Sequence, residues 1–181
     1  WEEGLPNMGR YEVKRMPLYN DDHSSKLRQM SQDLARADLL VFFSNRLYGT
    51  IPRLPDRYPI TGEYYNMLFS GELGYELADI ETAYPRLAGV TFVDDTFGRP
   101  GLPKPGVLST HQQIGLAVNL GFADESFSVY DHPMGLVFRN VGRLDSTTIR
   151  RAIESATPPS ALASQRSGQR PVGLLLSPED A

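Results

Sequence analysis

Residues 38–61 read "DLLVFFSNRLYGTIPRLPDRYPIT", and this stretch decides how the rest of the chain is interpreted. Five apolar residues, Leu39 to Phe43, predict a central strand that is covered on both faces of a sheet. Polar residues follow at once, and because of three prolines we expect the loop 45–60 to contain neither a helix nor a central strand. The loop is either a ligand site at the end of the strand or a rigid brace for the fold.

Apolar periodicity predicts further elements on both sides of this strand. A strand, a helix and a strand in succession predict a right-handed βαβ unit with parallel strands. Two strands joined by a short turn at 131–135 predict an antiparallel hairpin near the C-terminal end. The expected strands are 11–19, 38–44, 75–85, 89–95 and two within 126–141, and the expected helices are 21–37, 61–74 and 145–157.

This order of elements predicts an α/β fold. We expect a two-layer or three-layer sandwich with a mixed sheet, which has a parallel βαβ start and a C-terminal antiparallel hairpin. Short polar side chains before each helix are typical of N-caps. The expected N-caps are Asp22 or Ser24, then Thr61, then Asp145.

The chain has the size of one domain. With 181 residues it can bury one core, and we expect a single α/β domain over 1–157. Glycine and proline make 96–123 an irregular insertion within it. Residues 158–181 are rich in Ser, Pro, Ala and Gln at their start, which is typical of a linker.

Composition narrows the function classes. A net charge of −4 argues against broad binding to nucleic acid or to anionic lipid. The absence of cysteine excludes thiol catalysis and Cys-based metal sites, and the three histidines are far apart in sequence. No glycine-rich phosphate cradle follows the early strands. We therefore expect no metal, no cofactor and no nucleic-acid partner.

The loop after strand 38–44 is the candidate binding site. Open α/β sheets place ligands at the carboxyl ends of their strands, and this loop offers cationic forks and phenol hydroxyls suited to an anion or a sugar. In the structural interpretation, the arginines pair with acids while the prolines and tyrosines pack the loop onto the sheet. The candidate ligand-binding residues are Asn45, Arg46, Tyr48, Arg53, Arg57 and Tyr58.

Other polar pairs give weaker signals. Asp94 and Asp95 end a short strand, where paired carboxylates can hold a metal or act as acid and base, although such pairs are also common in turns. Asp131 and His132 are adjacent, but neighbours on a strand point to opposite faces, so a hairpin turn is favoured. We expect no catalytic residue in this chain.

Three stretches resemble a known family: "ADLLVFFSNRLYGTIPRLPDRYPITGEYYNMLFSGELGYEL", "ETAYPRLAGVTFVDD" and "ADESFSVYDHPMGLVFRN". They are similar to the soluble extracytoplasmic domain of bacterial polytopic membrane glycosyltransferases of the dolichyl-phosphate-mannose–protein mannosyltransferase-like, YYY-type membrane protein family. The resemblance covers most of 1–157 and is most specific in 37–77 and 124–140. The tail "GLLLSPEDA" resembles the segment that leads into a following membrane region.

This resemblance implies an accessory, non-catalytic domain at the extracytoplasmic face of the cytoplasmic membrane. In such transferases the catalytic acids lie outside this region, and none of them matches a position here. The domain would cover the active site or help to recognise an acceptor, and its partners would be the membrane-embedded remainder of the polypeptide, a glycan or lipid-phosphate sugar, or other membrane subunits. The alternative is a protein–protein interaction scaffold with no sugar recognition.

Overall fold

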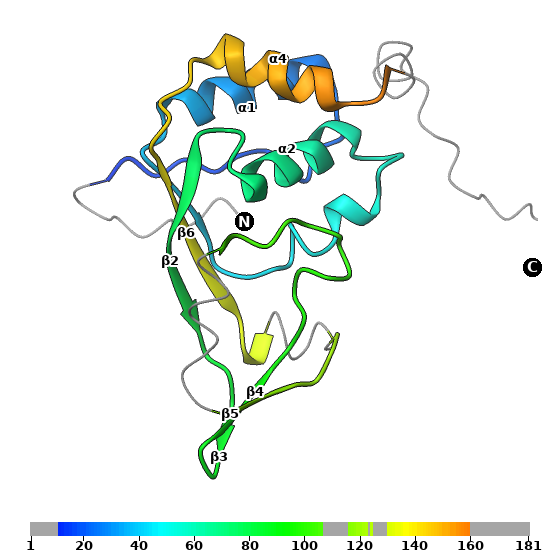
Figure 1. Ribbon diagram of the computed structural model, residues 1–181. Helices are drawn as coiled ribbons and strands as arrows, with labels where there is room; N and C mark the ends of the chain where they lie inside the picture. The colour runs from blue at the N-terminus through cyan, green and yellow to red at the C-terminus, as the bar shows by residue number, and fades with distance from the viewer. Residues whose placement is uncertain (1–10, 107–115, 123, 125–129, 160–181) are drawn as a thin grey trace, which may run out of the picture.

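The computed structural model describes residues 11–106, 116–122, 124 and 130–159 (Figure 1). The described residues form helices and short strands, which confirms the α/β class. In chain order the elements are α1 (Ser24–Arg36), β1 (Leu39–Phe42), the 3-10 helix η1 (Ile51–Arg53), α2 (Pro59–Ser70), β2 (Tyr75–Thr82), β3 (Arg86–Leu87), β4 (Val90–Val93), β5 (Leu116–Asn119), β6 (Met134–Asn140) and α4 (Ser146–Ala156).

The strands form two small sheets. Sheet A has the order β1-β6-β2, and its central strand β6 is antiparallel to both neighbours. Sheet B has the order β3-β4-β5, with an antiparallel β3–β4 pair and a parallel β4–β5 pair. In Figure 1 the helices α1 and α4 lie side by side at the top, α2 lies below them, and sheet B lies at the opposite end of the molecule.

The expected parallel start of the sheet is wrong. Residues 11–19 form no strand, and β1 pairs with β6 in antiparallel orientation. Pro17 interrupts the segment, and the Leu18 amide turns back to the Met16 carbonyl, so this backbone is not extended for a sheet. The mixed sheet is sheet B, whose strands follow β1 and β2 in the sequence.

Strand β1 is an edge strand of sheet A rather than a central strand. Its residues alternate between exposed and buried, with Leu39 and Val41 on the exposed face. The helices cover only the face that carries Leu40 and Phe42. The continuous apolar run therefore forms a half-buried edge strand. No other part of the chain that the structure describes covers Leu39 and Val41 on its outer face.

The C-terminal half differs from expectation in two places. Strand β6 lies between β1 and β2, so its partners come from far away in the sequence. Residues 125–129, which carry the first strand of the expected hairpin, lie outside the described residues. Strand β5 lies inside 96–123, the segment expected to be irregular.

Two of the three expected N-caps are wrong. The imidazole Nδ1 of His23 caps α1 by accepting from the Lys26 amide at 2.9 Å. Helix α2 begins at Pro59, which suits the first helical position, so Thr61 lies in the first turn and does not cap it. The Asp145 cap of α4 is confirmed, since its carboxylate accepts from the amides of the next turn.

Aromatic side chains fill the core between sheet A and α2. The rings of Phe42 and Phe138 meet edge to face at 5.8 Å, and Phe69 of α2 meets Phe138 at 5.3 Å. Tyr48, from the loop after β1, lies 5.2 Å from Phe69 and stacks on Phe97 at 5.9 Å. The loop is therefore part of the core, as its tyrosine content favours.

The two glycines at the end of sheet A allow a close backbone approach. Gly74 has a φ of 73°, a conformation that favours glycine, and its carbonyl accepts from the amides of Val141 and Gly142 at 3.0 and 2.8 Å. A Cβ on Gly74 would lie 3.0 Å from the Gly142 Cα, and a Cβ on Gly142 would lie 2.7 Å from the Gly74 Cα. This contact joins the start of β2 to the end of β6.

Candidate functional site

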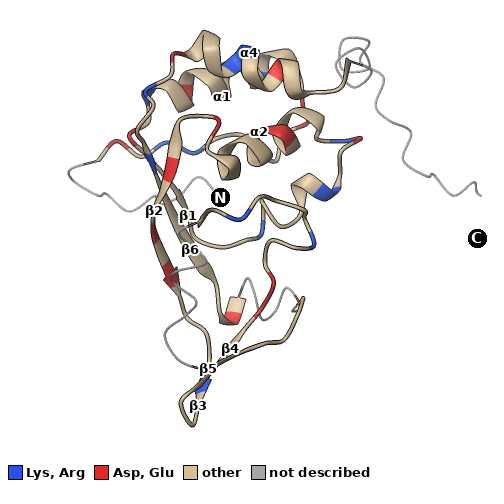
Figure 2. Ribbon diagram, viewed as in Figure 1, with Lys and Arg blue, Asp and Glu red and all other residues tan. Residues whose placement is uncertain are grey.

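The structure divides the six candidate binding residues into two groups. Asn45, Tyr48 and Tyr58 are buried, whereas the three arginines of the loop are exposed. In the view of Figure 2, acidic positions follow β2 on the left and basic positions follow the loop between β1 and α2 on the right. The loop thus offers cationic side chains to solvent and phenol rings to the core.

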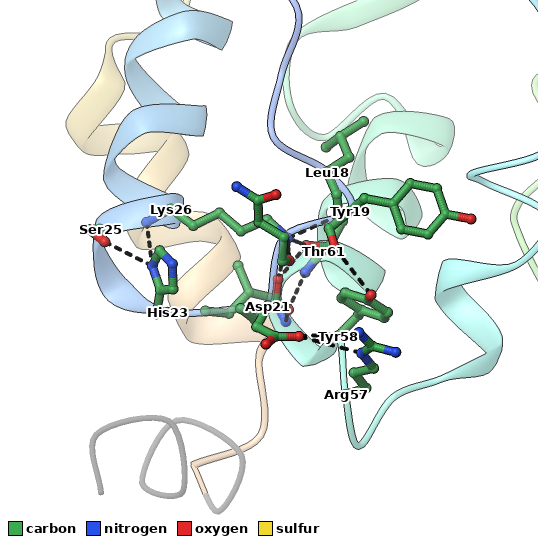
Figure 3. Close-up of polar contacts among 12 residues, drawn as sticks. Leu18, Tyr19, Asp21, His23, Ser25, Lys26, Arg57, Tyr58 and Thr61 are labelled. Carbon is green, nitrogen blue, oxygen red and sulfur yellow. Dashed lines mark hydrogen bonds and ion pairs between the residues drawn. The ribbon is translucent and has the colours of Figure 1, made fainter. Parts of the chain in front are cut away.

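The end of the loop contacts the N-terminal segment, by which we mean the described residues before α1 (Figure 3). The Arg57 guanidinium pairs with the Asp21 carboxylate at 3.4 Å and lies over the Tyr58 ring at 5.0 Å. The Tyr58 hydroxyl donates to the Tyr19 carbonyl at 3.2 Å. This half of the loop has the contacts of the structural interpretation, because both of its candidate residues bind the protein itself.

A buried ammonium group lies beside this contact. The Nζ atom of Lys26 is within 3.0 Å of four acceptors, which are the carbonyls of Leu18 (3.0 Å) and Asn20 (2.6 Å), the Asp22 carboxylate (2.7 Å) and the Thr61 hydroxyl (2.6 Å). Its side chain is about 1% exposed. Burial lowers the pKa of Lys26, while the hydrogen bond and charge of Asp22 act in the opposite direction.

Asp22, the partner of Lys26, also accepts hydrogen bonds from α2. Its Oδ2 atom accepts from the amides of Ile60 at 2.7 Å and Thr61 at 2.9 Å, two of the free N–H groups at the helix N-terminus. The negative charge also suits the positive end of the helix dipole. The Asp22–Lys26 pair therefore joins the N-terminal segment, α1 and α2. Its hydrogen-bonding capacity is filled from within the protein, so we assign it a structural role.

A second buried polar group lies at the start of the loop. We call Tyr48, Tyr84, Asp94 and Thr96 the Tyr48 cluster. The Asp94 carboxylate accepts from the Tyr84 hydroxyl at 3.0 Å and from the Thr96 hydroxyl at 3.1 Å. Within the described part of the chain, the Tyr48 hydroxyl and the Asn45 Oδ1 atom have no hydrogen-bond partner although both are buried.

The electrostatics of the Tyr48 cluster keep its phenols protonated. Burial raises the pKa of Tyr48, and the nearby Tyr84 phenol and Asp94 carboxylate raise it further. Burial also raises the pKa of Tyr84, with a second contribution from Asp94. The cluster thus combines hydroxyl donors with one carboxylate acceptor in the protein interior. The unpaired Tyr48 hydroxyl makes the cluster one candidate site among the described residues, beside the exposed Arg46 and Arg53 of the loop.

The expected Asp94–Asp95 pair is separated. Asp94 belongs to the Tyr48 cluster, whereas the Asp95 carboxylate pairs with Lys104 at 3.0 Å and accepts from the Gly98 amide at 3.0 Å. The Lys104 contact is the main cause of a lowered pKa for Asp95. Across the described ranges, no three His, Asp or Glu side chains are grouped closely enough to hold a metal ion.

Sequence reasoning missed several of these residues. Lys26 precedes Met30 by four positions, so it lies on the apolar stripe of α1, and a lysine there signals a buried pair with Asp22. Tyr84 and Thr96 carry no such signal, because only the tertiary fold brings them to Asp94.

None of the helices in the described ranges is both long and apolar enough to span a bilayer. A scan against protein-family models, a search of curated proteins and a search of solved structures each returned no match for this chain.

Proposed function

We propose that the chain is an accessory domain of a membrane-embedded glycosyltransferase that uses a lipid-phosphate-linked sugar. In this proposal the domain lies on the extracytoplasmic face of the cytoplasmic membrane. It covers the active site or contacts the acceptor, and the membrane-embedded remainder of the polypeptide supplies the groups that transfer the sugar.

The location of the resembling stretches supports this proposal. Residues 37–77 and 124–140 carry the most specific resemblance, and their described parts form β1, α2, β2 and β6. These four elements make sheet A and the helix that packs on it, so the resemblance concerns one continuous core. A shared core supports a shared type of domain, while the acceptor and the donor are set by surface residues.

The contacts of the loop 45–60 limit which of its side chains can reach a ligand. Arg57 and Tyr58 bind the N-terminal segment, so the loop residues left for an anionic sugar donor or a glycan are Arg46 and Arg53, which are exposed. Tyr48 of the same loop is buried in the core, where its ring contacts Phe69 and Phe97. Recognition therefore requires the two exposed arginines, and the buried tyrosines hold the loop in place.

A second candidate function is a protein–protein scaffold. Leu39 and Val41 of the edge strand β1 are exposed, and Phe43, directly after the strand, is 81% exposed. Exposed apolar edge strands are typical of protein–protein contacts. These exposed side chains favour a partner that adds to sheet A and needs no sugar.

The first experiment extends the reading frame that encodes the chain. The proposal requires flanking stretches of about 18 or more apolar residues that can span a bilayer. A second experiment compares sugar transfer by the full-length protein with Arg46→Ala and Arg53→Ala against a control with Arg28→Ala and Arg36→Ala, two exposed arginines of α1. We expect a loss of transfer only in the loop variant, and equal transfer in both would refute loop recognition.

A titration separates the two candidate functions. A water-soluble polyprenyl-phosphate sugar is added to the isotopically labelled chain, and backbone amide shifts are followed by NMR. Shifts that cluster around residues 45–58 support recognition. A spectrum that does not change at a saturating sugar concentration supports the scaffold.

A further inference from the structure

The side chain that caps helix α1 is a histidine. His23 has an extended backbone, with φ −160° and ψ 166°, and its Nδ1 atom accepts from the Lys26 amide at 2.9 Å. The Ser25 hydroxyl lies 2.8 Å from the same Nδ1 atom (Figure 3). A side chain that accepts from the third helical amide is an N-cap, and it satisfies one of the N–H groups that the start of a helix leaves free.

This cap works in only one protonation state of the imidazole. Nδ1 accepts through its lone pair, so it carries no proton, and the neutral ring bears its hydrogen on Nε2. Protonation converts Nδ1 into a donor. The ring can then still donate to the Ser25 hydroxyl, but it faces the Lys26 N–H with a hydrogen of its own. The cap of α1 is therefore present with neutral His23 and lost with the imidazolium.

No other side chain at the start of α1 takes over this role. Asp22, which precedes His23, has its carboxylate on Lys26, Thr61 and the first amides of α2. The first turn of α1 contains no acidic residue. Asp, Asn and Ser are the preferred N-caps and do not change charge near neutral pH, whereas imidazole does. A histidine cap therefore makes the start of α1 sensitive to pH.

The charges around His23 do not compensate for an imidazolium. In the part of the chain that the structure describes, no carboxylate forms an ion pair with His23, because Asp21 pairs with Arg57 and Asp22 with Lys26. The helix N-terminus is also the positive end of the helix dipole, which disfavours a cation. Helix α4, which packs on α1, offers two cations and one anion, so it adds no net negative charge; these are Arg150, Arg151 and Glu154.

The cap lies at the contact that holds the N-terminal segment. The first turn of α1 carries Lys26, whose Nζ atom binds the Leu18 and Asn20 carbonyls of that segment. His23 fixes the backbone of this turn, and the segment surrounds its lysine side chain. A turn that opens locally no longer holds Lys26 in one position, so the contacts of Lys26 with the segment weaken as well.

We propose that His23 is a pH-sensitive cap, whose protonation in mild acid opens the first turn of α1 and loosens the N-terminal segment. This inference goes beyond the proposed function, because it concerns the stability of one turn and holds whatever the domain binds. Arg57 and Tyr58 of the loop 45–60 contact the same segment, so acid also weakens the attachment of that loop.

The test follows amide hydrogen exchange of the full chain by NMR at about pH 7.5 and about pH 5.5, on either side of an ordinary imidazole titration. The reporters are the amides of Lys26, which donates to the cap, and Thr61, which donates to Asp22 of the segment. Protection factors remove the direct effect of pH on exchange. The protection factor of Lys26 should fall at least about fivefold in acid, the usual contribution of an N-cap, and that of Thr61 should fall with it. Unchanged protection of either amide overturns the proposal.

Two variants assign the response to His23. His23→Asn keeps a strong cap that does not titrate, so the protection of Lys26 should be high and equal at both pH values. His23→Ala removes the cap, and protection should be low at both. The matched control, His111→Asn with His132→Asn, removes the other two histidines and should keep the full response. An equal loss of protection in His23→Asn and in the unchanged chain contradicts the proposal.

The tautomer of His23 gives a check that needs no variant. Nitrogen-15 shifts of the imidazole ring in the unchanged chain distinguish a hydrogen on Nε2 from one on Nδ1. We expect the Nε2–H form at about pH 7.5, because Nδ1 accepts from the Lys26 amide. A ring that carries its hydrogen on Nδ1 at this pH would rule out the cap.

Discussion

Replacing Lys26 by methionine tests the buried pair that joins the N-terminal segment, α1 and α2. The Lys26 side chain is about 1% exposed, and the Asp22 side chain is fully buried. Methionine has a similar length but no charge, so it leaves the Asp22 carboxylate buried without its counter-ion. Breaking a buried pair in this way costs about 3–5 kcal/mol of folding free energy. A domain of this size has about 5–15 kcal/mol in total, so the variant should be folded but much weaker.

The assay is urea unfolding followed by far-UV circular dichroism, with the unchanged chain as reference. Lys14→Met is the matched control. Lys14, which lies before α1, pairs with Asp33 of α1, the helix that also carries Lys26, but the Lys14 side chain is 55% exposed. This control should cost less than about 1 kcal/mol. Combining Lys26→Met with Asp22→Asn removes both charges and should recover about 2 kcal/mol relative to the sum of the single changes. Equal losses for Lys26→Met and Lys14→Met would refute the structural role of the pair.

Two further predictions concern backbone shape and alkaline stability. Gly74→Ala should lower the free energy of unfolding by more than the roughly 1–2 kcal/mol that a positive φ costs, because the added Cβ also meets Gly142. The control is Gly101→Ala, which has a similar φ but lies in open space. In urea unfolding it should show only the conformational cost. Burial raises the pKa of Tyr64 above its usual 10.0, so the stability that it contributes is present below pH 10 and is lost as the pH rises further. Tyr64→Phe should reduce the slope of that loss by about 1.4 kcal/mol per pH unit, measured by urea unfolding at several alkaline pH values, and an unchanged slope would contradict the buried phenol.

Local signals in the sequence predicted the helices and several strands well. The Asp145 cap and the apolar spacing of Ile149 and Ile153 are local features, and α4 forms where they predict it. The strands β2 and β4 also lie within the ranges that their alternation indicates. Local chemistry therefore determines where these elements form.

Pairing between distant segments could not be predicted in the same way. The apolar run of β1 fits a parallel central strand as well as an antiparallel edge strand, and only its pairing with β6, almost 100 residues later, decides between them. Asp22 fits the N-cap of α1 by position, but in the fold it reaches the N-terminus of α2. In both cases the sequence indicates the kind of element or contact, but only the fold shows the partner, which is β6 for β1 and α2 for Asp22.

The candidate site shows the same division. The sequence predicts that the loop 45–60 is either a ligand site or a brace. The structure gives Arg57 and Tyr58 the contacts of a brace, and ligand binding by the rest of the loop stays a prediction. The Tyr48 cluster depends on Tyr84 and Asp94, which lie roughly 40 residues further along the chain. No spacing rule in the sequence connects them.

Sugar transfer from a radiolabelled polyprenyl-phosphate donor tests the central claim most directly. The measurement compares three preparations: vesicles with the full-length protein, vesicles with residues 11–157 replaced by a flexible linker, and the 181-residue chain alone. The account predicts transfer by the first, strongly reduced transfer by the second and none by the third. Transfer by the isolated chain, or undiminished transfer after the replacement, would contradict an accessory role for this domain.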